Sequence, residues 1–208
     1  VHQSIRDELI KEMKRAINDF YGDDVKGSES LGRIINERHF NRLRNILESD
    51  KEGLIYGGEY DEEEKYIAPS IIQVKDWNAA CMKEEIFGPI LPIMEYSDLN
   101  EVVNAINKQP KPLALYLFTS DKRVEKKVLN EISSGGVSIN DTILHLANSN
   151  LPFGGVGNAG MGAYHGEESF RTFSHRKSVL KKSRVLNTTL MYPPYSDKKL
   201  MVIKRFLK

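Results

Sequence analysis

The stretch LALYLFTSDKRVEKKVLNEISSGGVSI, residues 113–139, contains two kinds of hydrophobic pattern in alternation. It begins with a continuous apolar run of the length typical of a strand buried on both faces. Asp121 then precedes apolar residues at helical spacing over 124–132, and Gly136–Ile139 has the composition of another strand. The stretch therefore predicts two parallel strands joined by a helical crossover.

The same alternation extends toward the N-terminus. Ile90–Tyr96 predicts a strand, and Asp98-Leu-Asn-Glu101 has the acid-x-x-Glu spacing of a capping box at the start of a helix. The order from residue 90 to residue 139 is thus strand, helix, strand, helix, strand. This order predicts an α/β fold in which helices cross over a parallel sheet.

The first 75 residues contain two amphipathic helices and shorter strands. Apolar residues recur at helical spacing from Ile5 to Phe20, before a stop at Gly22, and again over Glu37–Leu47. Strands are predicted at Leu54–Tyr56 and Tyr66–Val74. The acidic residues between them, 59–64, predict an exposed turn rather than a metal site because they lack ligand spacing.

Composition limits the class of protein. The 208 residues are 40% apolar and 28% charged, which is ordinary for a globular chain. The longest apolar run, Leu113–Phe118, is far shorter than the roughly 20 residues that cross a bilayer. The single cysteine, Cys81, excludes an internal disulfide and a cysteine-based zinc cluster, so we expect no metal and a reducing, cytoplasmic location.

The formal charge of +1 conceals an uneven distribution. Residues 176–208 hold ten Lys or Arg and one Asp, whereas residues 1–175 hold 20 basic and 28 acidic side chains. A basic block suits an anionic membrane surface or nucleic acid, and it is also typical of a merely solvated tail. Aromatic residues that could stack on bases are scarce there, so we expect no nucleic-acid partner.

The glycine-rich segment 151–162 predicts a loop that borders a site. It contains Gly155-Val-Gly-Asn-Ala-Gly160, a literal match to the dinucleotide fingerprint. The match lacks the strand that should precede it and the acidic residue about 20 positions later, so we reject a phosphate site. His165-Gly-Glu167 similarly imitates a zinc deaminase motif whose cysteines are missing.

The residues from Cys81 to Ile90 place two carboxylates and an aromatic ring in a Gly-Pro turn directly before a strand. A carboxylate such as that of Glu85 can accept both hydroxyls of a ribose, and the ring of Phe87 can support a flat heteroaromatic group. This pattern favours a nucleoside site about as well as an ordinary surface loop. Cys81 itself is interpreted as a half-buried, unreactive thiol, since acids follow it and no histidine is near in sequence.

Several segments in collinear order resemble class 3 aldehyde dehydrogenases, and most of all the fatty-aldehyde branch. The resemblance runs from about Ile5 to Tyr195, and the Gly-Met-Gly-x-Tyr-His-Gly segment is specific to that class. The segments that carry it are Glu84-Glu-Ile-Phe-Gly-Pro89, Lys111-Pro-Leu-Ala-Leu-Tyr116, Ser133-Ser-Gly-Gly-Val137 with Asn140-Asp141, Leu151-Pro-Phe-Gly-Gly-Val-Gly-Asn158, Gly160-Met-Gly-Ala-Tyr-His-Gly166 and Thr172-Phe-Ser-His175.

The resemblance implies NAD- or NADP-dependent oxidation of fatty, medium-chain or aromatic aldehydes to carboxylic acids. It implies that Glu85 holds the nicotinamide ribose, that Phe87 contacts the nicotinamide, and that Phe153 and His165 line the aldehyde pocket. The expected organisation is a partial catalytic domain over 1–171, a C-terminal oligomerisation strand over 172–183 and a basic tail over 184–208. The strand falls within Phe170–Leu180, where weak alternation also predicts one.

The family's nucleophilic cysteine, general-base glutamate and oxyanion asparagine would lie upstream of Val1. By the resemblance, this chain is a C-terminal fragment of an aldehyde dehydrogenase that is inactive alone. The alternative is a truncated, non-catalytic protein that acts as a dimerisation partner. The expected partners are an aldehyde, a second copy of the chain and a membrane surface bound by the basic tail, with the protein in the cytoplasm or at the cytosolic face of the endoplasmic reticulum.

Overall fold

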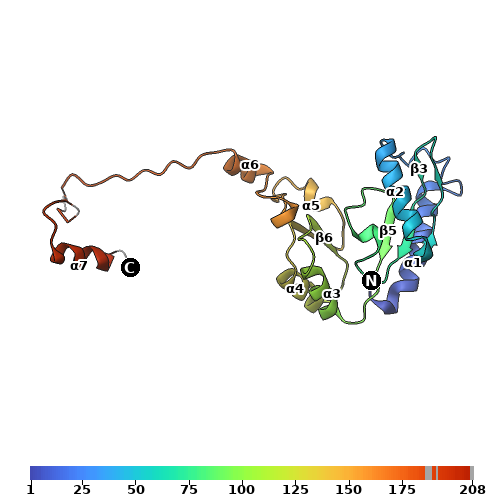
Figure 1. Ribbon diagram of the computed structural model, residues 1–208, viewed down its shortest axis with the longest axis horizontal. Coiled ribbons are helices and arrows are strands. Elements are labelled where there is room, and N and C mark those ends of the chain that lie inside the picture. Colours follow the sequence, from blue (N-terminus) through green and yellow to red (C-terminus); the bar gives the residue numbers. More distant parts are fainter. Residues whose placement is uncertain (186–188, 191, 207–208) are drawn as a thin grey trace.

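The computed structural model describes residues 1–185, 189–190 and 192–206. Figure 1 shows two lobes followed by an extended C-terminal segment that ends in a helix. The first lobe comprises residues 1–98 and the second comprises residues 99–172. The helices are α1 (Arg6–Tyr21), α2 (Glu37–Ser49), α3 (Leu99–Asn107), α4 (Lys122–Glu131), α5 (Leu144–Ala147), α6 (Gly166–Thr172) and α7 (Asp197–Phe206). The strands are β1 (Leu54–Tyr56), β2 (Tyr60–Asp61), β3 (Tyr66–Ile67), β4 (Ser70–Gln73), β5 (Ile90–Ile93), β6 (Ala114–Leu117) and β7 (Gly136–Ile139).

The first lobe is a sheet of order β1-β4-β5 between two helices. Side chains alternate across a strand, so neighbours in β4 face opposite sides. Ile72 packs with Phe40 and Leu43 of α2, whereas Ile71 packs with Ile10 of α1. Both predicted N-terminal helices are thus confirmed, and each covers one face of the sheet.

The second lobe confirms the strand–helix–strand unit over residues 113–139. β6 and β7 are parallel, with Ala114 opposite Gly136, and α4 connects them. The Asp121 side chain caps α4 by accepting from the backbone N–H of Arg123 at 2.7 Å. Val128 and Ile132 pack against Val103 of α3 and form the core of this lobe.

The predicted α/β fold with helical crossovers is confirmed, but the strands over residues 90–139 do not share one parallel sheet. β5 pairs in parallel with β4, and β6 pairs with β7, in separate sheets. Pro92 lies inside β5 and has no N–H to donate, which restricts β5 to the edge of its sheet. The predicted strand Tyr66–Val74 is also divided, into β3 and β4, where Pro69 interrupts the pairing.

Two further local predictions change. The acidic turn between residues 59 and 64 contains the short strand β2, which pairs with β3. Asp98 does cap α3, but it accepts from the backbone N–H of Asn100 at 2.8 Å, two residues on, rather than from that of Glu101 as a capping box requires.

The strand predicted within Phe170–Leu180 is not formed. Its first residues lie in α6, where Arg171 pairs with Glu167 at 2.7 Å and Glu168 at 3.3 Å. Phe173 ends α6 by donating its backbone N–H to the Ser169 carbonyl at 3.0 Å. Residues 175–181 are exposed and lie outside every helix and strand of the described part of the chain, and Figure 1 shows this segment leading away from both lobes. A strand needs a neighbour for its backbone hydrogen bonds, so a pattern of side chains alone does not make one.

Within the described residues, the structure contains no helix that is both long and apolar enough to cross a membrane. The basic tail predicted over 184–208 includes α7. Residues 186–188, 191 and 207–208 of that tail lie outside the described residues.

Candidate functional site

The turn before β5 is held in place by a side chain of α2. The guanidinium of Arg42 donates to the Glu84 carboxylate at 3.1 Å, to the Glu85 carbonyl at 3.3 Å and to the Ile86 carbonyl. Gly88 lies so close to Leu43 that an added Cβ would be 2.5 Å from a Leu43 methyl group. The turn is therefore fixed to the core of the first lobe at both of its ends.

Glu85 and Phe87 extend outward from this fixed turn. Phe87 is 78% exposed and has a φ of 46°, a left-handed conformation that non-glycine residues adopt at a cost of about 1 kcal/mol or more. The Glu85 side chain is exposed as well. The turn thus presents a carboxylate and an aromatic ring to the outside, which a ribose and a flat heteroaromatic ring could both use.

The second predicted pair is brought into direct contact in the other lobe. The rings of Phe153 and His165 stack at 5.9 Å between centroids, with 22° between their planes. A short antiparallel bridge joins Phe153 to Tyr164, and the rings of Tyr164 and His165 meet edge to face at 4.5 Å. Two segments of the glycine-rich loop therefore assemble one aromatic cluster.

Sequence reasoning missed two members of this cluster, Tyr116 and His145. The His145 ring lies 5.8 Å from Tyr116 and 5.9 Å from Phe153. It packs over Gly136 of β7, where an added Cβ would be 2.8 Å from His145 Cδ2. A side chain at the first position of β7 would displace this ring. The Gly-Gly pair before Val137 was the one feature of the sequence that indicated a close approach of another group here.

The cluster contains buried polar atoms that the described residues leave unsatisfied. Both ring nitrogens of His145 and Nδ1 of His165 are buried without a hydrogen-bond partner in the described part of the chain. Such atoms cost free energy unless a ligand, water or another segment supplies a partner. They are candidates to bind the polar end of a substrate.

An apolar groove of about 480 Å³ begins beside the cluster. Phe153 and Tyr164 form one part of its wall, and Leu113, Met161 and Phe173 form much of the rest. Ligand sites commonly combine an apolar wall with a few polar groups. The groove suits the apolar body of a ligand, and neither His145 nor His165 belongs to its lining.

Comparison with known proteins identifies the family to which the chain belongs. The model of the aldehyde dehydrogenase family matches residues 1–179. The chain belongs to the aldehyde dehydrogenase family.

The relatives include class 3 members, as the sequence motifs predicted. The chain is 47% identical over its whole length to a 4,4'-diaponeurosporen-aldehyde dehydrogenase of Staphylococcus aureus, and it covers 45% of that protein. It is 48% identical to aldehyde dehydrogenase family 3 member A2 of Rattus norvegicus, over 98% of this chain and 42% of the relative. It is also 48% identical to the dimeric NADP-preferring aldehyde dehydrogenase of the same species, over 92% of this chain and 42% of that protein.

Solved structures agree with the fold. The substrate-bound state of Staphylococcus aureus AldH superimposes with a TM-score of 0.87 at 47% identity, covering all of this chain and 45% of that one. A Mycobacterium tuberculosis aldehyde dehydrogenase complexed with NAD+ gives 0.75 at 26% identity, covering 88% and 38%. The chain spans less than half the length of these relatives. Their names support the expectation of NAD or NADP as cofactor.

Cys81 is not the reactive thiol of an aldehyde dehydrogenase. It is 2% exposed, and burial together with the carboxylate of Asp50 raises the pKa of the thiol to about 12. Burial alone would raise the pKa of Asp50 too, but the backbone N–H groups of Cys81 at 2.8 Å and Ala80 at 3.0 Å bring it below its usual value. The pair is a structural link between the end of α2 and the turn Ala80–Met82, as the sequence interpretation of an unreactive thiol predicted.

Proposed function

We propose that this chain forms the substrate-facing and cofactor-facing part of an NAD- or NADP-dependent aldehyde dehydrogenase that oxidises fatty, medium-chain or aromatic aldehydes to carboxylic acids. The observation that carries the proposal is the apolar groove that begins at the stacked rings of Phe153 and His165. An apolar groove favours aldehydes with a long or aromatic body over small polar ones. The relative named 4,4'-diaponeurosporen-aldehyde dehydrogenase supports an aldehyde as the substrate.

In this proposal the turn before β5 holds the cofactor. The Glu85 carboxylate accepts the hydroxyls of the nicotinamide ribose, and the Phe87 ring contacts the nicotinamide side. The residues fit the group because both are exposed on a turn that Arg42 and Leu43 fix. When bound, the cofactor accepts hydride from the aldehyde carbon.

The covalent chemistry needs a thiolate that these 208 residues do not supply, because Cys81 is their one cysteine and is buried. We therefore propose that the nucleophilic cysteine, the general-base glutamate and the oxyanion asparagine come from polypeptide outside the chain. The contribution of this chain is to bind the aldehyde body and to orient the cofactor relative to it.

The test measures aldehyde-dependent reduction of NAD and NADP by the native polypeptide captured from its source cells, with hexanal, hexadecanal, benzaldehyde and the small polar glycolaldehyde as substrates. We expect turnover that favours hexadecanal, and a KM for it that rises when Phe153 is replaced by Ala. The 208-residue chain alone should give none. Turnover limited to small polar aldehydes would overturn the substrate class. No turnover, combined with capture of a full-length relative, would favour the non-catalytic dimerisation partner.

We further propose that residues 172–183 mediate a homodimer. Residues 175–181 of this segment are exposed and lie outside every helix and strand, and their backbone is available to pair with a strand of a second copy. Light scattering of the native polypeptide should give a dimer, and deletion of residues 173–183 should give a monomer. A dimer that survives the deletion would place the interface elsewhere.

We also propose that the basic tail binds an anionic membrane surface, which would place the protein in the cytoplasm next to a membrane. α7 carries Lys198, Lys199, Lys204 and Arg205 together with exposed Met201 and Phe206. Apolar side chains and cations on one helix are typical of interfacial helices. The polypeptide should sediment with phosphatidylserine vesicles and not with phosphatidylcholine vesicles, and deletion of residues 197–206 should abolish this difference.

A further inference from the structure

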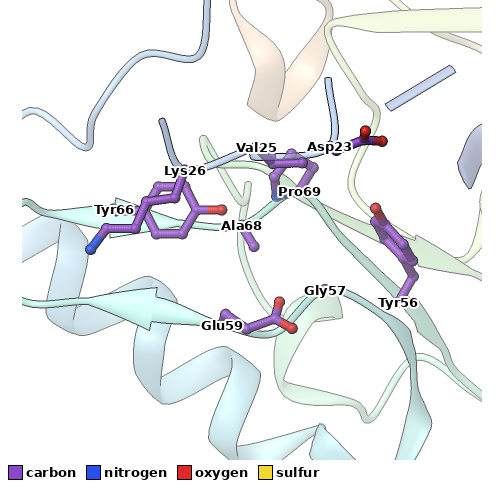
Figure 2. Close-up of a pocket in the computed structure, with 9 residues that line it drawn as sticks. All are labelled: Asp23, Val25, Lys26, Tyr56, Gly57, Glu59, Tyr66, Ala68 and Pro69. Atoms are coloured by element: carbon purple, nitrogen blue, oxygen red, sulfur yellow. The ribbon is translucent and has the colours of Figure 1, made fainter. Parts of the chain in front are cut away.

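We infer that the first lobe contains a second ligand site, a pocket between the loop after α1 and the β1–β4 edge of the sheet, that takes a small organic ammonium ion. The pocket has a volume of about 480 Å³, within the range of small-molecule sites. None of its residues belongs to the proposed cofactor turn or to the aromatic cluster. Its lining residues are Asp23, Val25, Lys26, Tyr56, Gly57, Glu59, Tyr66, Ala68 and Pro69, and Figure 2 shows all of them.

The hydroxyl of a largely buried tyrosine side chain opens into this pocket without a hydrogen-bond partner among the described residues. Tyr66 is 5% exposed, and its hydroxyl makes no hydrogen bond with any residue that the structure describes. One face of its ring is covered by the guanidinium of Arg33, 5.1 Å from the centroid. Figure 2 shows the hydroxyl directed into the space bordered by Ala68. A hydroxyl placed this way can accept a hydrogen bond from a ligand.

The pocket also has an excess of negative charge. Glu59 and Asp23 line it, and within the described residues neither carboxylate has an ion-pair partner. The Lys26 ammonium also lines the pocket, but it pairs with Asp61 at 2.7 Å and Glu64 at 3.0 Å. Figure 2 shows its nitrogen directed away from the Glu59 carboxylate. Lys26 is thus already paired, whereas the two acids that line the pocket are not. The Lys14 ammonium lies outside the lining, 5.7 Å from the centroid of the Tyr56 ring.

These features select the chemistry of the ligand. An ammonium group is a compact charge with three donors, and it can bind a carboxylate and a phenolic oxygen together. Val25, Ala68 and Pro69 supply apolar surface for the carbon body that carries the charge. An anionic ligand would meet Glu59 and Asp23, and a neutral alcohol would leave both charges unpaired. A primary amine with a short apolar body fits all of these conditions.

The test is calorimetric titration of the protein with benzylammonium and with benzyl alcohol, its neutral analogue. We expect benzylammonium to bind at least about tenfold more tightly, since hydrogen bonds to charged groups are the stronger ones. Glu59→Gln should weaken benzylammonium binding about tenfold, and Tyr66→Phe should weaken it by a smaller factor. Neither change should affect benzyl alcohol.

Glu63→Gln is the matched control, because Glu63 belongs to the same acidic stretch and does not line the pocket. It should leave benzylammonium binding unchanged. Equal affinity for the amine and the alcohol, equal loss in the Glu59 and Glu63 variants, or no binding of benzylammonium would each overturn the inference. Asp23→Asn, a change at an exposed loop residue, provides the same test if the Glu59 variant does not fold.

Discussion

Replacing Arg42 by Ala should release the turn that carries Glu85 and Phe87. The change removes two hydrogen bonds to backbone carbonyls and one ion pair. Glu84 is 56% exposed, so its ion pair contributes below about 1 kcal/mol. The carbonyl bonds come from a charged donor whose side chain is 24% exposed. At about 1 kcal/mol net for each, because the donor stays partly exposed, the two carbonyl bonds contribute about 2 kcal/mol, and the ion pair adds less than either.

The assay is hydrogen exchange of the backbone amides of residues 84–88, combined with urea unfolding. A loss of about 2 kcal/mol corresponds to roughly thirtyfold faster exchange through local opening. Arg44→Ala is the matched control, because Arg44 lies on the same helix and pairs with one exposed carboxylate, that of Glu62, at 3.2 Å. It should leave exchange of the turn unchanged.

Either of two results would refute the reasoning on Arg42. Unchanged exchange at residues 84–88 would mean that the contact of Gly88 with Leu43 fixes the turn alone. Equal acceleration in the Arg42 and Arg44 variants would mean that the effect comes from weakening α2 as a whole. Under the proposed function, the Arg42 variant of the native polypeptide should also raise the KM for the cofactor more than it changes the KM for the aldehyde.

Three further predictions concern packing and titration. Gly136→Ala should destabilise the second lobe by about 1–3 kcal/mol in urea unfolding, because the added Cβ would meet the His145 ring at 2.8 Å. Gly32→Ala is the control, because a Cβ added at Gly32 would have no atom within 4 Å, and it should change stability little. Cys81 should react with iodoacetamide at pH 8 about a thousandfold more slowly than a free cysteine, because a pKa of about 12 leaves roughly one thiol in ten thousand ionised. Rapid labelling of the folded chain would contradict this prediction. The pKa of Asp50 is lower in the folded chain than in the unfolded chain. Its ionised carboxylate therefore stabilises the fold above the ordinary carboxyl pKa, and this stabilisation is lost as pH falls through the folded pKa. Asp50→Asn should reduce the drop in melting temperature on acidification, and an unchanged drop would count against the Asp50–Cys81 link.

The elements that could be predicted from the sequence are those whose pattern is local. α1, α2 and the unit β6–α4–β7 follow from apolar periodicity, and the Asp121 cap follows from one polar residue at a helix start. The interruption at Pro69 and the edge position of β5 were also encoded locally, by prolines that cannot donate to a ladder. Pro69 and Pro92 both lie within apolar runs whose pattern alone predicts longer, uninterrupted strands.

Features that depend on a distant neighbour could not be predicted in the same way. The segment after Thr172 has side chains suited to a strand, but strand formation depends on a partner that side-chain pattern does not specify. The pairing of β4 with β5 and the separation of β6 from β5 likewise depend on which edges are free.

The candidate sites also differ in whether their residues come from one segment of the chain or from several. Glu85 and Phe87 lie in one short turn, so a linear pattern of residues could indicate this pair. Phe153 and His165 were implied only by the resemblance to class 3 aldehyde dehydrogenases, and each lies within a motif that carries that resemblance. His145 joins the second pair only because β7 begins with a glycine that lets its ring approach. The ammonium pocket draws on the loop after α1, the end of β1 and the strand β3, and no linear pattern connects these segments. A site built from one segment can be found from sequence, whereas a site built from three is defined by the packing that brings them together.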